Sequence, residues 1–357
     1  MKILLIKYRN IGDVLLVTPL ISNLKLFYPY AKIDVALNSG TEEVITLNPN
    51  ISKVLIYDRS QIKSLTLIIR IWREIKFFLS FRKNNYDLVI NLTEGDRGNL
   101  IAKLTKAPIR IGYEGSNQFL KNAFTHHLPK QNFRHTIETN LDPLEYLKAP
   151  VKTKKVDIFW SENDDRVINK ELFGINQFIH IHPVSRWLFK CIEDKTMAEI
   201  IDFFEIKVGL RVILTADSNA YEITKINCIL KYCSSRPLNL SGKLSLKQTA
   251  ALNKRAKLFV GVDTAIMHIS AANNTPVFAF FGPSGADHWG PWDNSFSEST
   301  YKQRNGIQAM GIHKVFSESR ACQPCGNDGC SGSKISDCLM SMNLTNIQDN
   351  ILEMLNE

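Results

Sequence analysis

Short apolar, β-branched runs alternate with helix-like segments along the chain, and this alternation constrains the fold more than any other feature. In the first half, strands are expected at residues 2–6, 32–37, 53–57, 88–91 and 109–112. Between them lie helical patterns at residues 20–27, 41–47, 62–81 and 97–104. Strands that alternate with helices form βαβ units, so this half is predicted to be an α/β domain with a parallel sheet.

The segment 147–164 interrupts the rhythm with a proline and several lysines, and it is the expected linker. A second series follows, with strands at 178–182, 211–215, 258–262 and 277–281 and helices at 196–206, 220–231, 246–253 and 266–273. A last helix is expected at 346–355. At 357 residues the chain exceeds one ordinary core, so two Rossmann-like domains facing a central cleft are expected, 1–155 and 156–340, with a C-terminal helix in 341–357.

The formal net charge of +9 favours an anionic partner: a phosphate compound, a nucleic acid or an anionic membrane. No nucleic-acid partner is expected, because the cations are spread out and no recognised binding motif is present. An NAD-dependent activity is not expected, because neither half has G-x-G-x-x-G after its first strand. No secretory signal or membrane helix is visible, so the expectation is a soluble cytoplasmic protein.

The stretch IKYRNIGDVLLVTPL, residues 6–20, carries one carboxylate, Asp13, between a strand and a helix. Aspartate is a preferred N-cap, which is the structural interpretation. The functional interpretation is a general base at the carboxyl end of a strand, where Gly12 lets a ligand approach closely. The helix either begins at Thr18, with Pro19 at its first position, or begins near Asp13 and kinks.

The stretch HIHPVSRWLFK, residues 180–190, places Ser185, Arg186 and Lys190 after a predicted strand. A hydroxyl and two cations near a helix N-terminus suit a phosphate or pyrophosphate. A solvated basic loop is the alternative.

The stretch GVDTAIMHISAANNTPVFAFFGPS, residues 261–284, is the most informative. Asp263 and Thr264 lie between a buried strand and a helix, which Thr264 could cap, and the N–H groups of Thr264, Ala265 and Ile266 would point at an anion. His268 lies one turn on, and a packed core histidine is the structural alternative.

Three further residues follow or link elements of the second half: Asp217, Glu222 and Leu244. The two carboxylates could accept hydrogen bonds from a ribose or an adenine amino group, and the leucine could lie against a base. Solvated loop residues are the alternative.

Seven cysteines are unevenly placed. Cys191, Cys228 and Cys233 are scattered and are expected to be reduced core thiols. Four more are clustered near the end: Cys322, Cys325, Cys330 and Cys338. Four thiolates could hold zinc, but their spacing departs from paired CxxC units, so free thiols are the favoured interpretation and no metal site is predicted.

Four stretches together resemble glycosyltransferase family 9, the ADP-heptose:lipopolysaccharide heptosyltransferases: IGDVLLVTP, HPVSRWLFK, LSGKLSL and GVDTAIMHISAANNTPVFAFFGPS. The N-terminal stretch, SRWLFKCIEDK and the cysteine-bearing tail are most similar to the members that add a third, branch heptose. The resemblance implies a GT-B fold, with the acceptor mainly on the first domain and the nucleotide-sugar mainly on the second. The alternative is a GT-B transferase or epimerase that uses a different nucleotide-sugar.

The resemblance also implies an inverting transfer without a metal or cofactor, from ADP-heptose to the lipid A-core glycolipid. Asp13 matches the catalytic base, and Ser185 and Lys190 match the positions that hold the donor diphosphate. Asp263 matches the residue that grips heptose hydroxyls, with Thr264 and Ala265 at the diphosphate turn. Arg9 and Asn10, beside Asp13, are candidates to hold the acceptor.

A lipid-linked acceptor would place the protein at the cytoplasmic face of the inner membrane, as a peripheral protein. The segment 59–83 mixes basic residues with many apolar ones. An ordinary helix with one buried face is one interpretation, and a face that contacts anionic lipid is the other.

Overall fold

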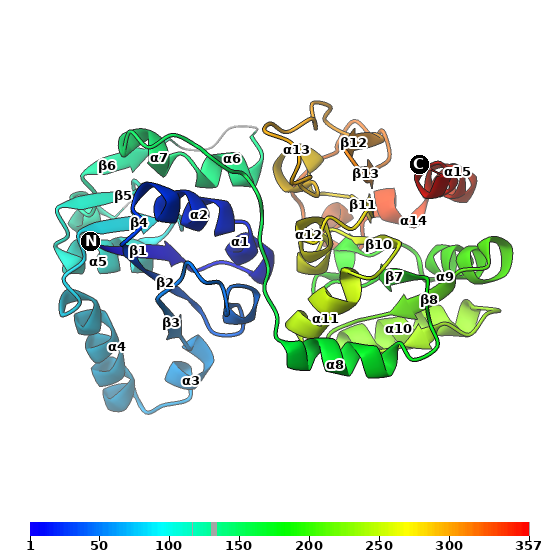
Figure 1. The fold of residues 1–357 in the computed structure, drawn as a ribbon, viewed down its shortest axis with the longest axis horizontal. Helices are drawn as coiled ribbons and strands as arrows, with labels where there is room; N and C mark the ends of the chain where they lie inside the picture. The colour runs from blue at the N-terminus through cyan, green and yellow to red at the C-terminus, as the bar shows by residue number, and fades with distance from the viewer. Residues whose placement is uncertain (116, 130–133, 357) are drawn as a thin grey trace. The chain divides into compact units, whose positions relative to one another are not determined.

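The computed structural model describes residues 1–115, 117–129 and 134–356, and the chain forms two compact units, Met1–Phe159 and Trp160–Glu357. Each unit contains one sheet with helices (Figure 1). No helix in the described ranges is long and apolar enough to span a bilayer.

The first unit contains a six-stranded sheet in the order β3-β2-β1-β4-β5-β6, and every pair is parallel. Its strands are β1 Lys2–Lys7, β2 Lys32–Asn38, β3 Lys53–Tyr57, β4 Leu88–Asn91, β5 Ile109–Tyr113 and β6 His126–Leu128. Its helices are α1 Ile11–Leu15, α2 Thr18–Phe27, η1 Glu42–Val44, α3 Arg59–Lys63, α4 Leu67–Arg82, α5 Asp96–Thr105, η2 Gln118–Leu120, α6 Thr136–Asn140 and α7 Pro143–Tyr146.

The second unit contains a seven-stranded sheet in the order β12-β13-β11-β10-β7-β8-β9, parallel except for the edge pair β12–β13. Its strands are β7 Phe178–His182, β8 Arg211–Leu214, β9 Leu238–Asn239, β10 Leu258–Val262, β11 Val277–Phe280, β12 Gln308–Met310 and β13 His313–Phe316. Its helices are α8 Glu162–Glu171, η3 Leu188–Lys190, α9 Asp194–Asp202, the π-helix η4 Phe203–Val208, α10 Ala220–Tyr232, α11 Leu246–Asn253, α12 Ala265–Ala272, α13 Ala286–Trp289, η5 Cys330–Gly332, α14 Asp337–Met340 and α15 Leu344–Asn356.

In each sheet the order of the strands reverses at the first strand, so the strands that follow lie first on one side of it and then on the other. This reversal point determines where the candidate site lies. In the first unit β2 and β3 lie on one side of β1, whereas β4 follows on the other. In the second unit β8 and β9 lie on one side of β7, and β10 lies on the other. Ligands of open α/β sheets bind outside the carboxyl ends of strands at such a switch point. The expected sites are therefore the ends of β1 with β4 and of β7 with β10.

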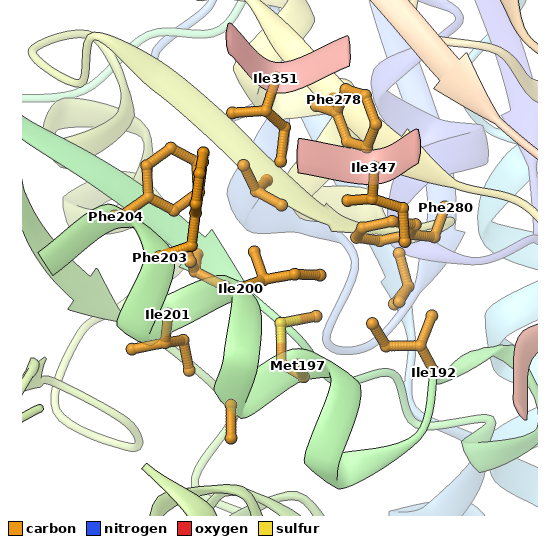
Figure 2. Close-up of a cluster of buried hydrophobic side chains, with 14 of the residues drawn as sticks. Ile192, Met197, Ile200, Ile201, Phe203, Phe204, Phe278, Phe280, Ile347 and Ile351 are labelled. Atoms are coloured by element: carbon orange, nitrogen blue, oxygen red, sulfur yellow. The ribbon is translucent and has the colours of Figure 1, made fainter. Parts of the chain in front are cut away.

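Alternating side chains of the second sheet pack against helices on both faces, which is why its strands are apolar throughout. On one face, Ile179 and Ile181 of β7 pack with Met197 of α9 and with Ile347 and Ile351 of α15. Figure 2 shows this cluster, in which α15 contributes alongside side chains of the α9 region and β11. The other face packs against α8 and α11. The last helix is thus a structural part of this core.

Several predicted elements differ from the structure. The helix predicted at 62–81 is two helices, α3 and α4, separated at residues 64–66, and the one predicted at 41–47 is only the short turn η1. The helix predicted at 196–206 changes from α9 into the π-helix η4. The predicted linker is too long, because α8 begins inside it with a capping box between Ser161 and Asp164. That S-x-x-D pattern was the overlooked signal.

Four strands were not predicted: β6, β9, β12 and β13. Each has two to four residues. Strands this short give no measurable alternation, and they form because a sheet edge is already present to receive them.

Candidate functional site

The turn after β1 contains four of the predicted site residues. Arg9 and Asn10 are exposed, and Gly12 and Asp13 are partly buried. Asn10 is the N-cap residue of α1, and its carbonyl accepts from the Val14 N–H at 3.1 Å. The interpretation of Asp13 as an N-cap is therefore wrong. Its carboxylate lies in the first turn of α1, where the helix dipole favours negative charge.

Neither alternative for the following helix describes the structure fully, because α1 and α2 are separate helices. The Leu16 N–H donates to the Gly12 carbonyl at 3.0 Å, closing α1. Pro19 lies in the first turn of α2, where its missing N–H costs nothing. Val17, not Thr18, is the N-cap of α2, and the Thr18 hydroxyl donates to the Leu15 carbonyl at 2.9 Å.

A buried lysine below Asp13 was not predicted. Lys7, the last residue of β1, is only 5% exposed. Its ammonium donates to the Leu92 carbonyl at 3.3 Å and to Asn140 Oδ1 at 3.2 Å. Burial lowers the pKa of Lys7 to about 8, although the Asp13 carboxylate acts to raise it and Arg9 to lower it further. The sequence signal was a lysine ending the apolar run of β1.

In the second unit, the loop after β7 holds three predicted residues. Ser185 is buried, and its hydroxyl oxygen accepts from the Trp187 N–H at 3.2 Å, which leaves the hydroxyl proton able to donate. The Arg186 guanidinium lies over the Trp187 ring, 5.0 Å from its centroid. Lys190 ends the short helix η3, which turns its side chain toward β10.

Lys190 and Asp263 form an ion pair, with Nζ 2.5 Å from Oδ2. It joins the loop after β7 to the residue after β10, at the switch point of this sheet. Asp263 is buried. Burial acts to raise its pKa, but the Lys190 charge and hydrogen bond, a hydrogen bond from Ser284 and the nearby His268 outweigh it and hold the pKa below its usual value. Asp263 is therefore an ionised carboxylate.

The helix after Asp263 begins without a side-chain cap. Thr264 is the N-cap of α12, in an extended conformation, so the predicted cap position is confirmed, but its hydroxyl makes no capping bond. Its Oγ1 is buried and finds no hydrogen-bond partner among the described residues. The adjoining first-turn N–H groups, Ala265 onward, carry the positive end of the helix dipole. Together they form a suitable anion site.

His268 lies in the buried part of α12. Its charge is one of the smaller influences that lower the pKa of Asp263. The structural interpretation, a packed histidine, thus agrees with its burial, while its field acts on Asp263.

Asp217 and Glu222 stabilise the turn between β8 and α10 through hydrogen bonds. Glu222 is buried, and its Oε2 accepts from the Asp217 N–H at 2.8 Å, while its own N–H donates to Asn219 Oδ1 at 3.0 Å. The Gly242 N–H donates to the Ala216 carbonyl at 2.9 Å, so the segment after β8, which contains Asp217, adjoins the segment after β9, which contains Leu244. Leu244 packs partly buried against the α8–α11 core.

Two further buried histidines lie next to this loop and were not predicted. His180 Nε2 and His182 Nδ1 lie 2.7 and 2.9 Å from the Thr215 hydroxyl oxygen. Burial lowers the pKa of His180 to about 4 and of His182 to about 3. Both rings are neutral near pH 7, so the end of β7 is rigidly hydrogen-bonded without adding charge.

The cysteine-rich tail packs against the turn after β11. Gln323 Nε2 donates to the Gly282 carbonyl at 3.1 Å, and the Gly326 N–H donates to the Pro283 carbonyl at 2.9 Å. All seven cysteines are free thiols. Within the part of the chain that the structure describes, no three His, Cys, Asp or Glu side chains are arranged to hold a metal ion.

The residues of segment 59–83 divide between two faces. Phe77, Phe78 and Phe81 pack into the core of the first unit. Positions 68, 71, 72, 75 and 79 of α4 recur at helical spacing and are exposed, Ile68 at 82% and Trp72 at 61%. The helix is therefore apolar on its outer face as well as on its inner one.

Comparison with known proteins agrees with this geometry. The family model for glycosyltransferase family 9 (heptosyltransferase) matches residues 74–311. The chain is 32% identical to lipopolysaccharide heptosyltransferase 3 of Escherichia coli over 291 residues, which are 80% of this chain and 84% of that protein.

Two solved structures share the fold over almost the whole chain. A family 9 glycosyltransferase from Veillonella parvula has a TM-score of 0.79 at 19% identity, covering 99% of this chain and 97% of its own. The E. coli ADP-heptose LPS heptosyltransferase II has a TM-score of 0.75 at 20% identity, covering 100% and 99%. The predicted GT-B fold class is confirmed, and the chain belongs to glycosyltransferase family 9, the heptosyltransferases.

Proposed function

We propose that this protein transfers a heptosyl group from ADP-heptose to the inner core of lipopolysaccharide or lipooligosaccharide, adding a third, branch heptose. The observation that carries the proposal is the Lys190–Asp263 ion pair beside the uncapped start of α12, at the sheet's switch point. This pair places an ammonium that can bind a diphosphate next to a carboxylate that can accept hydrogen bonds from sugar hydroxyls. The relationship to heptosyltransferase 3 supports the choice of sugar and acceptor.

We assign the donor to the second domain. The diphosphate would accept hydrogen bonds from Lys190, Ser185, the Thr264 hydroxyl and the first N–H groups of α12, including that of Ala265. Arg186 adds positive charge in the same loop. Asp263, released from part of its ion pair, would accept from heptose hydroxyls. The loop residues Asp217 and Leu244, with Glu222 in the first turn of α10, would border the nucleoside, and the charge of His268 would help to keep Asp263 ionised.

We assign the acceptor and the base to the first domain. Asp13 takes the proton of the acceptor hydroxyl while that oxygen bonds to the anomeric carbon. The bond from that carbon to the ADP oxygen breaks on the opposite face, through an oxocarbenium-like transition state, and configuration inverts. Lys190 and the α12 amides stabilise the negative charge on the departing diphosphate. Arg9 and Asn10, exposed beside Asp13, are suited to hold the acceptor.

We further propose that the protein works at the cytoplasmic face of the inner membrane, where a lipid-linked acceptor is anchored. The support is the outer face of α4. Exposed Ile68, Trp72 and Ile75 form an apolar stripe, and cations border it, with the Lys76 Nζ 5.0 Å from the centre of the Trp72 ring. A helix of this kind lies in an anionic lipid interface, its apolar side in the acyl boundary and its cations at the headgroups.

An assay with purified protein tests the function. The acceptor is core glycolipid from a strain that lacks this chain, and mass spectrometry follows the gain of one heptose. ADP-heptose should be used and UDP-sugars should not. Asp13→Ala should lower turnover by about 100-fold or more, the usual scale for general-base catalysis, and leave ADP affinity unchanged.

The matched control is Asp58→Ala, which removes another carboxylate at a strand-to-helix turn of the same domain, the N-cap of α3. It should keep near-normal turnover. Full activity of Asp13→Ala would overturn the base assignment, and turnover of UDP-sugars alone would point to a different nucleotide-sugar enzyme.

A further inference from the structure

Lys7 is a charged residue at the buried end of an apolar strand, and the proposed reaction assigns it no role. Moving an ammonium into a strand end that is 5% exposed costs free energy, unless nearby groups compensate. A methionine would fill the same space without that cost. The cation therefore needs an explanation beyond packing.

The hydrogen-bond partners of Lys7 are neutral. They are the Leu92 carbonyl, just after β4, and the Asn140 amide oxygen on α6. The charged groups that act on the ammonium come from the turn above it, Asp13 on α1 and Arg9. The carboxylate of α6, Glu138, is paired with Lys154 at 3.4 Å. Asp13 is thus the carboxylate whose field Lys7 experiences.

Asn140 connects the lysine to the helix that carries Asp13. Its Oδ1 accepts from Lys7, and its Nδ2 donates to the Leu16 carbonyl at 2.9 Å, at the end of α1. A helix of one turn has little stability of its own. The bridge from Lys7 through Asn140 to Leu16 therefore fixes α1, and with it the direction of the Asp13 side chain.

We propose that Lys7 is a positioning residue for Asp13: through Asn140, its buried ammonium fixes the helix that aims the carboxylate, and its positive charge acts on that carboxylate. The inference deepens the proposed function and rests on it for the role of Asp13 as base. In the reaction the acceptor proton passes to Asp13, Lys7 keeps its own proton throughout, and the nearby positive charge then favours release of the Asp13 proton to water.

The coupling is reciprocal. The Asp13 carboxylate acts to raise the pKa of Lys7, and the interaction between two charges has the same free energy seen from either side. The lysine charge is present below pH about 8 and is lost as the pH rises through that value. The wild-type enzyme should therefore lose activity on the alkaline side of about pH 8.

One experiment needs no turnover. The Lys7 amine is followed by NMR in the full-length, ¹³C,¹⁵N-lysine-labelled protein and assigned by its loss in Lys7→Gln. Its titration midpoint should lie near pH 8 in the wild type and fall in Asp13→Asn, which removes the negative charge. An unchanged midpoint in Asp13→Asn would overturn the proposed coupling.

The second experiment is the pH profile of kcat/KM. Lys7→Gln keeps a polar group but loses the charge, so the acidic limb should move to higher pH by about one unit, the lower end of the usual effect of a nearby opposite charge. The alkaline limb near pH 8 should disappear. Lys7→Arg, which retains the charge, should restore the acidic limb, and KM for ADP-heptose should not change.

The matched control is Lys2→Gln, at the opposite end of β1, where the ammonium bonds Asn84 Oδ1 at 3.1 Å. Its profile should be that of the wild type. A lower rate in Lys7→Gln with both limbs unmoved would mean a purely structural role and overturn the proposal. Absence of ADP-heptose turnover in the wild type would instead refute the proposed function, while the NMR titration would still decide the coupling.

Discussion

Lys190 and Asp263 neutralise each other in the structure, and this pairing determines how each should respond to substitution. The lysine is the cation proposed for the diphosphate, and the aspartate holds it at 2.5 Å. A diphosphate must therefore compete with a carboxylate for the ammonium. The carboxylate that is partly released becomes an acceptor for sugar hydroxyls.

Opposite effects on ADP affinity are expected at this pair. Lys190→Gln should weaken ADP binding about 10- to 100-fold, because a hydrogen bond to a charged group contributes about 1.5–3 kcal/mol. Asp263→Asn should bind ADP at least as well as the wild type, since the lysine loses its competing partner, but transfer heptose poorly. Calorimetric titration with ADP measures both. Weaker ADP binding in Asp263→Asn would contradict the competition.

Site residues near strand ends could be predicted from the sequence where several polar side chains follow an apolar strand. Ser185, Lys190, Asp263 and Thr264 belong to such motifs, and the structure gathers them at one switch point. The burial of Lys7 could not be predicted, because a lysine at the end of a strand is normally the first residue exposed to solvent. Its burial depends on Asn140, which is 133 residues away in the chain and gives no local signal.

At the scale of elements, the end of β7 is held by two neutral histidines that share the Thr215 hydroxyl. Their pKa values of about 4 and about 3 lie below the unfolded value of 6.5. Above pH 6.5 both states of the protein carry neutral rings, and this contribution to stability is complete. As the pH falls below 6.5, only the unfolded chain binds the protons, so stability is lost down to about pH 4.

The free energy of unfolding should therefore fall between pH 6.5 and pH 4 by about 1.4 kcal/mol per pH unit for each histidine. His182→Asn should reduce this slope by about that amount. Urea unfolding at several pH values measures it, and the control is His127→Asn, at an exposed ring of the first unit. An unchanged slope in His182→Asn would contradict the assignment.

Elements with a clear apolar pattern could be predicted, as β1, β10 and α10 show, whereas the ten-residue helix α8 was missed because its sequence is mostly polar. The division of 62–81 into α3 and α4 could not be predicted, since residues 64–66 contain neither proline nor glycine. The two helices are separate because the backbone of Thr66, just before α4, is extended rather than helical. Residue type alone does not determine this conformation.

At the scale of the whole molecule, positive charge and exposed apolar surface coincide on one helix. The chain carries a net charge of +9, and α4 presents Ile68, Trp72 and Ile75 outward among its cations. A second copy of such a face would be repelled by its own charge, whereas anionic lipid satisfies both the charge and the apolar stripe.

Vesicle sedimentation tests this surface. Wild-type protein should bind vesicles of phosphatidylcholine with 30% phosphatidylglycerol, and not neutral ones. Replacing Ile68, Trp72 and Ile75 with serine should reduce bound protein about 10-fold or more, since each buried apolar side chain contributes about 1.5–3 kcal/mol at full burial. The control is Phe173→Ser, at an apolar residue of the second unit that is 90% exposed. Equal binding by all variants would refute a membrane role for α4.

The packing of α15 into the core of the second unit has a consequence for biosynthesis. Ile347 and Ile351 are completely buried beside Ile181 of β7, although almost the whole second unit separates them in the chain. In the first unit, by contrast, the Asn23 side chain is already bonded to the backbone at residues 152 and 153. During translation the first unit can close while the ribosome is still adding the second. The core of the second unit can be completed only after α15 has been synthesised.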